Sequence, residues 1–279
     1  MGLKILFEDK DILIIDKPAG LIVNESLNCI QDNLAIYLKS NFDWLKHQNW
    51  PVDYEKFIPH DYPIQYGKAE DIFLQRSGIV HRLDKDTSGV LIIAKHPGSL
   101  LNLLQQFQNR QVKKIYLSLV HGKILEEEGL WLTNIIRHQK KRCQFLAQKQ
   151  STSGREAITH YRVQKILRFD VERRMIWLKE KKIKSKDLKK IYQDFSLVEF
   201  YPQTGRTHQI RAQGQFFHHA LVGDSVYASK KQINLDYCWC PRQFLHSSQI
   251  SFFHPRLQKK VIIKSQLPKE LKEALKFLI

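Results

Sequence analysis

The sequence has few cysteines and no long apolar run, and both absences narrow the class of protein. Four cysteines in 279 residues, Cys29, Cys143, Cys238 and Cys240, are too few and too scattered for a disulfide framework. No second cysteine pair is present to complete a four-ligand zinc site around Cys238 and Cys240. No apolar run approaches the roughly 18 residues that a transmembrane helix needs. We therefore expect reduced thiols, no metal site and no membrane partner.

The N-terminus also lacks the features of an exported or lipid-anchored chain. Acidic side chains at Glu8, Asp9, Asp11 and Asp16 interrupt the region where a signal peptide has an unbroken apolar stretch. The opening MGLKIL lacks the Ser or Thr that N-myristoylation favours at position six. We expect a cytoplasmic protein.

Acidic residues are scarce in the second half of the chain. Residues 1–140 hold 17 basic and 17 acidic side chains, so the whole net charge of +17 lies in residues 141–279. Such asymmetry is typical of a face that binds a polyanion, because Lys and Arg that neutralise phosphates release counterions. The alternative is that the excess positive charge serves only to keep the protein soluble. The densest stretch, 179–190, has seven lysines and no aromatic residue, which is typical of a solvated loop or hairpin tip with room for phosphate contacts.

Apolar patterning predicts strands in both halves of the chain. Two short runs at 5–7 and 12–15 flank an acidic turn, and GVLIIAK at 89–95 has the length of a buried strand. Alternation over 115–124 places Tyr116 on the face opposite the more apolar one. Further strand-like segments lie at 156–166, 174–179 and 195–201.

Helical patterns are fewer, and none separates the chain into domains. Apolar residues recur with helical spacing over 98–110, and THQIRAQGQFF permits a short helix over 207–217 with Thr207 as its cap. Residues 29–78 are rich in aromatics and prolines, which favours an irregular, insertion-like excursion. We predict a single α+β domain over 1–279, with a largely antiparallel or mixed sheet flanked by helices.

Two polar segments have the residue types that chemistry requires. HRLDKDTSG at 81–89 lies between apolar segments, and loops held in this way often carry catalytic groups. Its Asp84 could act as nucleophile or general base, kept ionised by Arg82 and Lys85, with an ordinary charged turn as the alternative. TGRTHQIR at 204–211 suits anion binding or pairing with a carboxylate. The Gly-Asp pair that contains Asp224 is more typical of a turn.

Taken together and in order, these segments resemble a known family. The similarity is carried by KPAG near the start and then by HRLDKDTSGVLIIAK, KKIYLSLVHGKI, TGRTHQIRAQG with VGDSVYA, and FLHSSQISFFHP. They are similar to RluA-type pseudouridine synthases over roughly residues 5–30 and 79–265. The joined HRLD-x-x-TSG and GR-T-HQ-IR elements make this resemblance highly specific.

The resemblance implies the pseudouridine synthase catalytic fold and its reaction. Such an enzyme isomerises uridine in folded RNA by breaking the glycosidic bond and rejoining the sugar to carbon 5 of the same base, with no cofactor or metal. The partner would be ribosomal or transfer RNA, and the protein is expected to be a monomer. A stacked base cannot be reached, so the target would be flipped out at a cost of a few kcal/mol.

The resemblance also implies roles for individual residues. Asp84 would be the catalytic aspartate, either attacking the sugar or abstracting a sugar proton, and Arg211 would pair with it. Tyr116 would stack near the flipped base and assist removal of the carbon 5 proton. The remaining residues implied to bind substrate are Arg82, in the space that the nucleotide vacates, Ile210, beside the base, and Arg206 and His208. We expect His81 and His208 to be structural or RNA-contacting rather than catalytic.

Some features depart from the family pattern. The strand that begins at residue 5 leaves no room for the small N-terminal RNA-binding domain that members often have, so we expect the catalytic domain itself to grip RNA. The segment 29–78 is longer than usual between the first motif and HRLD, and HHALVGD replaces the more usual GHPIVGD. These departures bear on the identity of the substrate.

Two other classes of function compete with this one. A metal-dependent nuclease could hold magnesium with Asp84, Asp86 and Asp224, and would then shorten RNA in a reaction that EDTA abolishes. A non-catalytic RNA-binding protein or chaperone would require damage at the functional positions, yet Asp84, Tyr116 and Arg211 are all present.

Overall fold

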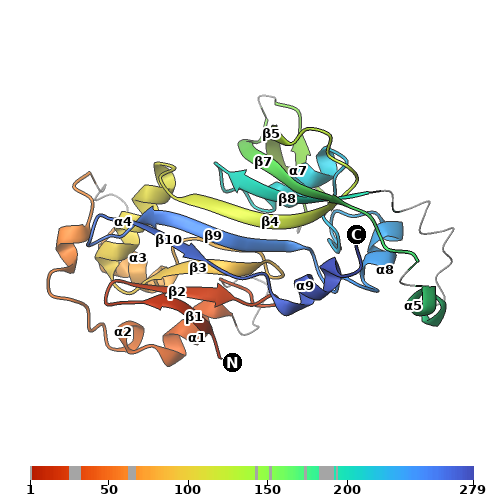
Figure 1. The fold of residues 1–279 in the computed structure, drawn as a ribbon. Helices are drawn as coiled ribbons and strands as arrows, with labels where there is room; N and C mark the ends of the chain where they lie inside the picture. The colour runs from red at the N-terminus through yellow and green to blue at the C-terminus, as the bar shows by residue number, and fades with distance from the viewer. Residues whose placement is uncertain are drawn as a thin grey trace. The chain divides into compact units, whose positions relative to one another are not determined.

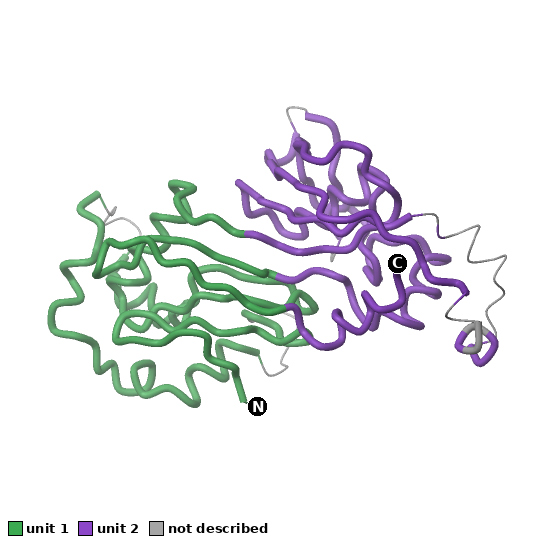
Figure 2. Tube along the Cα trace, in the orientation of Figure 1, with its two compact units in different colours: residues 1–114, 247–266 green, residues 115–246, 267–279 purple. Residues whose placement is uncertain are grey.

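The computed structural model describes residues 2–24, 33–61, 67–141, 144–150, 153–172, 175–181, 192 and 194–279. The chain divides into two units, of which unit 1 comprises Met1–Lys114 and Ser247–Gln266, and unit 2 comprises Ile115–His246 and Leu267–Ile279 (Figure 2). The single catalytic domain expected over 1–279 stays a prediction. No helix among the described residues is long and apolar enough to cross a membrane.

Unit 1 is built on antiparallel strands (Figure 1). Its strands are β1 (Lys4–Glu8), β2 (Ile12–Lys17), β3 (Ser88–Ala94), most of β9 (Leu245–Phe253) and β10 (Lys260–Lys264). They follow the order β1-β2-β3-β9, with β10 paired to β9. All seven residues of β3 are buried, and β2 is buried except at Asp16. The continuous apolar runs therefore form central strands, as their sequence predicts.

Helices occupy much of the segment that was expected to be irregular. They are α1 (Leu34–Asn41), α2 (Asp43–Lys46), the 3-10 turn η1 (Tyr54–Phe57) and α3 (Ala69–Arg76). Asn33 caps α1, because its side chain accepts a hydrogen bond from the Ile36 amide at 3.0 Å. Aromatic rings connect these short helices: the centre of the Trp50 ring lies 5.5 Å from that of Phe73 and 5.6 Å from that of Tyr54. The helix predicted at 98–110 is α4 (Pro97–Gln108).

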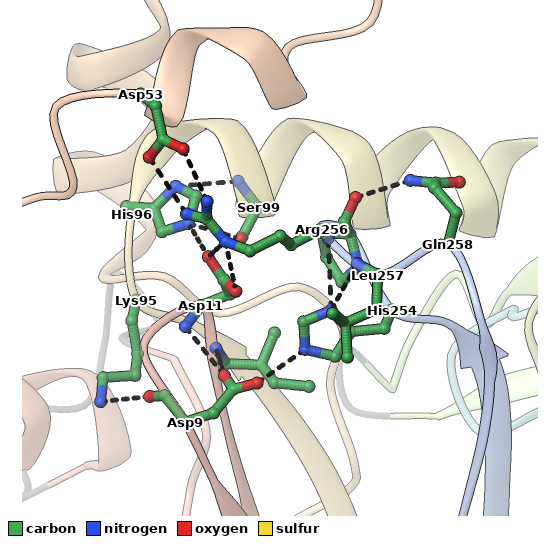
Figure 3. A network of polar contacts seen from close by, with 12 residues as sticks. Asp9, Asp11, Asp53, Lys95, His96, Ser99, His254, Arg256, Leu257 and Gln258 are labelled. Carbon is green, nitrogen blue, oxygen red and sulfur yellow. Dashed lines mark hydrogen bonds and ion pairs between the residues drawn. The ribbon is translucent and has the colours of Figure 1, made fainter.

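A partly buried polar network joins the segment around η1 to the β1–β2 turn (Figure 3). The guanidinium of Arg256 binds Asp11 at 2.9 and 3.0 Å and Asp53 at 2.6 Å, and it lies 4.4 Å from the centre of the Phe57 ring. His254 lies 2.7 Å from Asp9. Asp9, Asp11 and His254 could each direct one atom to a metal ion. Because a guanidinium already neutralises Asp11, we assign this network a structural role.

Unit 2 is a second antiparallel arrangement (Figure 1). Its strands are β4 (Lys113–His121), β5 (Glu128–Arg137), β6 (Phe145–Gln148), β7 (Arg155–Leu167) and β8 (Phe195–Pro202), in the order β4-β8-β7-β5-β6. Its helices are α5 (Met175–Glu180), α7 (Gln209–Phe216), α8 (Lys230–Asp236) and α9 (Lys269–Leu275). The α+β class with a largely antiparallel sheet is confirmed.

Both faces of β4 are covered. On β4, Leu119 belongs to a core cluster with Leu271 and Ala274 of α9, whereas the next residue, Val120, belongs to a cluster with Ile210 of α7. Alternating side chains therefore enter two separate cores, as the period of a strand requires. The face that carries Tyr116 therefore also meets an apolar cluster, against which Tyr116 packs.

The strand predicted over 174–179 is wrong, since its described part belongs to helix α5. A segment of six residues with mixed polarity fits both the helical and the strand period, so contacts with distant residues decide its secondary structure. Trp177 packs 5.1 Å from Phe277 and 6.2 Å from Phe169, which holds this turn of helix against the core. Most of the lysine-rich stretch 179–190 lies outside the described residues.

Candidate active site

In unit 1, the Asp84 loop is a tight turn between buried anchors. Ile79, Val80 and Leu83 are buried, whereas Asp84 is half-buried and Arg82 is exposed. The Thr87 amide donates to the Asp84 carbonyl at 3.1 Å, which closes the turn. The apolar anchors therefore fix the backbone while the carboxylate keeps access to solvent.

A buried lysine connects this turn to the KPAG segment. Lys17 is fully buried, and its ammonium donates to the carbonyl oxygens of Pro18, Leu21 and Lys85 at 2.8 to 2.9 Å. The Gly20 amide also donates to the Lys85 carbonyl at 2.9 Å. Three acceptors satisfy the three donors of the ammonium, so its burial is compatible with its charge. The first motif thus holds the backbone next to Asp84, a structural role that the sequence did not reveal.

Gly89 ends the turn where only glycine is accommodated. Its φ is +115°, and an added Cβ would lie 2.2 Å from the Ser247 carbonyl oxygen. His81 begins the loop: its Nε2 accepts a hydrogen bond from the Ile92 amide at 3.1 Å, and its ring stacks on Phe107 at 5.0 Å. Burial, with the nearby charge of Lys114, lowers the pKa of His81 to about 3. His81 is therefore a neutral structural residue.

In unit 2, Tyr116 and Ile210 belong to the same apolar surface. Tyr116 lies opposite Phe200 in the β4–β8 ladder and is half-buried. It packs against the cluster that contains Ile210, which is 5% exposed. The structure thus brings together two of the predicted site residues from segments that are almost a hundred positions apart.

Arg211 is held by a carboxylate that sequence analysis treated as a turn residue. Its Nε donates to Asp224 Oδ2 at 2.7 Å and its Nη2 to Asp224 Oδ1 at 2.9 Å. Both side chains are buried, and the guanidinium carbon lies 5.2 Å from the centre of the Tyr227 ring. Asp224 also accepts hydrogen bonds from the amides of Val226 and Tyr227, so it does serve a turn. A carboxylate so engaged is a poor magnesium ligand, which disfavours the nuclease alternative.

Two glutamines that sequence analysis missed fix the helix that carries Arg211. Gln213 Nε2 donates to the Trp131 carbonyl, the Ala157 carbonyl and Thr133 Oγ1, each at 3.1 Å. One turn earlier, Gln209 Nε2 donates to the Ile158 carbonyl at 3.1 Å, and its Oε1 accepts from the Arg206 amide at 3.0 Å. A buried amide pair at i and i+4 therefore docks α7 on β5 and β7. This spacing was the signal available in the sequence.

The remaining predicted residues lie at the start of α7. His208, not Thr207, is the N-cap, with φ 55° and no side-chain cap hydrogen bond, so the predicted cap is wrong. His208 Nδ1 lies 3.0 Å from the Tyr227 hydroxyl, and Arg206 Nε donates to the Glu156 carbonyl at 3.0 Å. The left-handed backbone at His208 turns the chain sharply into the helix, a geometry that capping preferences do not signal.

The predicted site residues are divided between the two units. Asp84 and Arg82 belong to unit 1, and Tyr116, Arg206, His208, Ile210 and Arg211 belong to unit 2. The structure gives Arg211 a partner in Asp224. The pairing of Arg211 with Asp84 stays a prediction.

Comparison with known proteins gives the family. A family model described as RNA pseudouridylate synthase matches residues 11–215. The uncharacterized RNA pseudouridine synthase YlyB of Bacillus subtilis is 30% identical over 273 residues, covering 98% of this chain and 72% of that protein. Ribosomal large subunit pseudouridine synthase D of Nitrosomonas europaea is 33% identical over 272 residues, covering 96% and 63%.

Solved structures agree on the fold. The human protein RNA Pseudouridylate Synthase Domain Containing 1 matches 96% of this chain and 84% of its own, with a TM-score of 0.63 at 20% identity. The match to the family model spans the Asp84 loop, Tyr116 and the start of α7 through Arg211. The chain therefore belongs to the RNA pseudouridylate synthase family and is an RNA pseudouridine synthase.

Proposed function

We propose that this chain converts specific uridines of structured ribosomal RNA to pseudouridine, with Asp84 as the catalytic carboxylate. The observation that carries this proposal is the Asp84 turn, whose backbone is held by the Lys17 ammonium and by the close approach at Gly89. A rigid backbone beneath a half-buried carboxylate is what a preorganised catalytic group requires. The names of relatives such as the Nitrosomonas protein favour ribosomal over transfer RNA.

The reaction cleaves the bond between the sugar C1′ and N1 of uracil and forms a bond between C1′ and C5. Asp84 acts either as nucleophile at the sugar or as the base that removes a sugar proton, and both routes release uracilate. After the base rotates and rejoins through C5, a proton leaves C5 and a proton is taken up at N1, so no atom is gained or lost. No redox partner is needed.

Other residues of both units would support distinct steps of this reaction. Tyr116, on the apolar surface that includes Ile210, would stack on the flipped base and assist removal of the C5 proton. The guanidinium of Arg211, aimed by Asp224, would pair with Asp84 and keep it ionised. The exposed Arg82 would fill the space that the flipped nucleotide leaves. Phosphate contacts from the basic second half, including Arg206 and His208, would offset the few kcal/mol that base flipping costs.

The test is to map pseudouridine with carbodiimide and primer extension in total RNA from cells with and without the gene. The deletion strain is complemented with wild type, Asp84→Asn or Asp86→Asn, the last being a matched carboxylate-to-amide change in the same loop. We expect wild type and Asp86→Asn to restore one or a few marks, and Asp84→Asn to restore none while still folding and binding RNA. Restoration by Asp84→Asn would remove Asp84 from the mechanism, and a mark in transfer RNA would correct the substrate.

A further inference from the structure

A basic cavity lies beside the start of α7 in unit 2. Its volume is about 430 Å³, and its walls include Arg137 at the end of β5, Phe145 at the start of β6, Arg155 at the start of β7, and Arg206. Two glycines, Gly154 and Gly205, also line it. No acidic side chain is among the described residues of its wall. Volumes of roughly 300 to 1,000 Å³ are typical of sites for small organic groups.

Strand register explains why the arginines converge. Arg137 lies directly opposite Phe145 in the β5–β6 ladder, and Ile135, two residues before Arg137, lies opposite Arg155 in the β5–β7 ladder. Cross-strand partners and residues two apart share one face of a sheet, so these side chains project to the same side. At Gly154, an added Cβ would lie 2.5 Å from the Ile136 side chain and 3.0 Å from the Ile135 carbonyl.

The chemistry of the wall selects a phosphate. Guanidinium groups present a fixed fork of donors that matches phosphate oxygens. Arg206 is held in place by hydrogen bonds from its Nε to the Glu156 carbonyl and from its amide to Gln209. Phe145 is half-buried and adds an aromatic surface of the kind on which bases stack.

Two contacts connect this cavity to Arg211. The ring of Phe145 meets the His208 ring edge-on at 5.7 Å, and the Phe145 amide donates to the Tyr227 hydroxyl at 3.0 Å. The Tyr227 ring lies against the Arg211 guanidinium. The cavity therefore adjoins helix α7, which carries Arg211 and Ile210.

We propose that this cavity binds a nucleotide of the RNA strand next to the reacting uridine, with its phosphate on Arg137, Arg155 and Arg206 and its base against Phe145. The proposal rests on the proposed function, because only an RNA substrate supplies a neighbouring nucleotide. It assigns a role to two arginines and one aromatic residue outside the motifs of the family.

Binding to deproteinised large-subunit ribosomal RNA tests the proposal by filter binding at several salt concentrations. The variants are Arg137→Gln with Arg155→Gln, and Phe145→Leu, all in the Asp84→Asn background so that turnover does not affect binding. Arg168→Gln is the control, since it removes an exposed positive charge from the same unit outside the cavity. We expect the double arginine variant to bind at least about tenfold more weakly, with a salt slope up to about one smaller, at roughly 0.9 for the one phosphate contact that is lost.

Phe145→Leu distinguishes stacking from charge. We expect it to weaken binding about five- to tenfold with an unchanged salt slope, since a stacking contact releases no counterions. Double-variant binding equal to that of Arg168→Gln would overturn the proposal. Inorganic phosphate at constant ionic strength competes for the same arginines, so we expect it to narrow this difference; a difference that phosphate leaves unchanged would also overturn the proposal. Product formation by the same variants with Asp84 intact is scored separately, so a wild type without product refutes the proposed function instead.

Discussion

Replacing Asp224 with Asn tests whether the buried carboxylate holds unit 2 together around Arg211. Asp224 is fully buried and accepts four hydrogen bonds: two from the Arg211 guanidinium, and two from the amides of Val226 and Tyr227. Breaking a buried ion pair by changing one partner typically costs about 3–5 kcal/mol. Because Asn keeps one acceptor oxygen, we expect Asp224→Asn to lower the free energy of unfolding by about 3 kcal/mol.

The matched control is Asp194→Asn, at an ion pair whose Arg168 side chain is 75% exposed. Exposed pairs contribute about 0–1 kcal/mol, so this variant should lose no more than that. Urea unfolding followed by tryptophan fluorescence measures both losses, with the slope of unfolding free energy against urea checked for a change in the unfolding transition. A loss for Asp224→Asn no larger than that for Asp194→Asn would refute the argument that burial makes this pair strong.

A double-mutant cycle with Arg211→Met separates the pair from the turn. If Asp224 acts through Arg211, the double variant should lose at least about 1.5 kcal/mol less than the sum of the single losses. Additive losses would mean that the Val226 and Tyr227 amides, rather than Arg211, account for the effect.

Three further predictions concern the residues that support the site. Gly89→Ala should lower the free energy of unfolding by more than about 3 kcal/mol, because the added Cβ meets the Ser247 carbonyl. Gly20→Ala, also at positive φ but with no atom within 4 Å of the added Cβ, should lower it by about 1–2 kcal/mol. Equal losses for the two variants in thermal unfolding would exclude the clash with Ser247. His81 is neutral in the fold because its pKa is lowered to about 3, while the unfolded chain takes up a proton below pH about 6.5. The stability that the neutral His81 contributes is therefore complete above pH about 6.5 and is lost towards pH 3, with a slope of up to about 1.4 kcal/mol per pH unit. Urea unfolding at several pH values should show that the free energy of unfolding of His81→Gln lacks this pH dependence. Parallel curves for wild type and His81→Gln would contradict the prediction. Gln213→Leu should lower the free energy of unfolding by about 2–4 kcal/mol, because the buried acceptors on β5 and β7 lose their donor. Gln215→Leu, at an exposed position of the same helix, should change it by about 0.5 kcal/mol or less in the same assay.

Sequence patterns predicted the strands where burial was continuous or alternation was long. The runs at 12–15 and 89–95 became β2 and β3, because an apolar run of this length has to be covered on both faces. The short helices between Asn33 and Arg76 escaped prediction, since each has few residues and depends on ring contacts such as Trp50 with Phe73. The segment that became α5 was assigned the wrong type for the same reason: its conformation is decided by distant residues.

The sequence indicates candidate site residues but not the groups that hold them in place. Asp84, Tyr116 and Arg211 belong to motifs, so their residue types and order are visible in the sequence. The groups that hold them are ordinary residues at long range: Lys17 reaches a carbonyl 68 positions away, and Gln213 reaches strands more than 50 positions earlier. Only the fold determines which lysine or glutamine meets which backbone oxygen.

The two arginines of TGRTHQIR show why a motif alone does not assign roles. Arg211 is 5% exposed, and an uncompensated charge at that depth would cost several kcal/mol, so Asp224 has to accompany it. Arg206, five positions earlier, is half-buried and lines a cavity, where part of its charge stays hydrated and an incoming phosphate can replace that hydration. Two arginines of one motif therefore differ in role: Arg211 is an oriented internal group, whereas Arg206 is partly accessible and is the one that we propose as an RNA contact. A salt titration would count only basic side chains of this accessible kind, because a charge that is neutralised inside the protein releases no counterion when RNA binds.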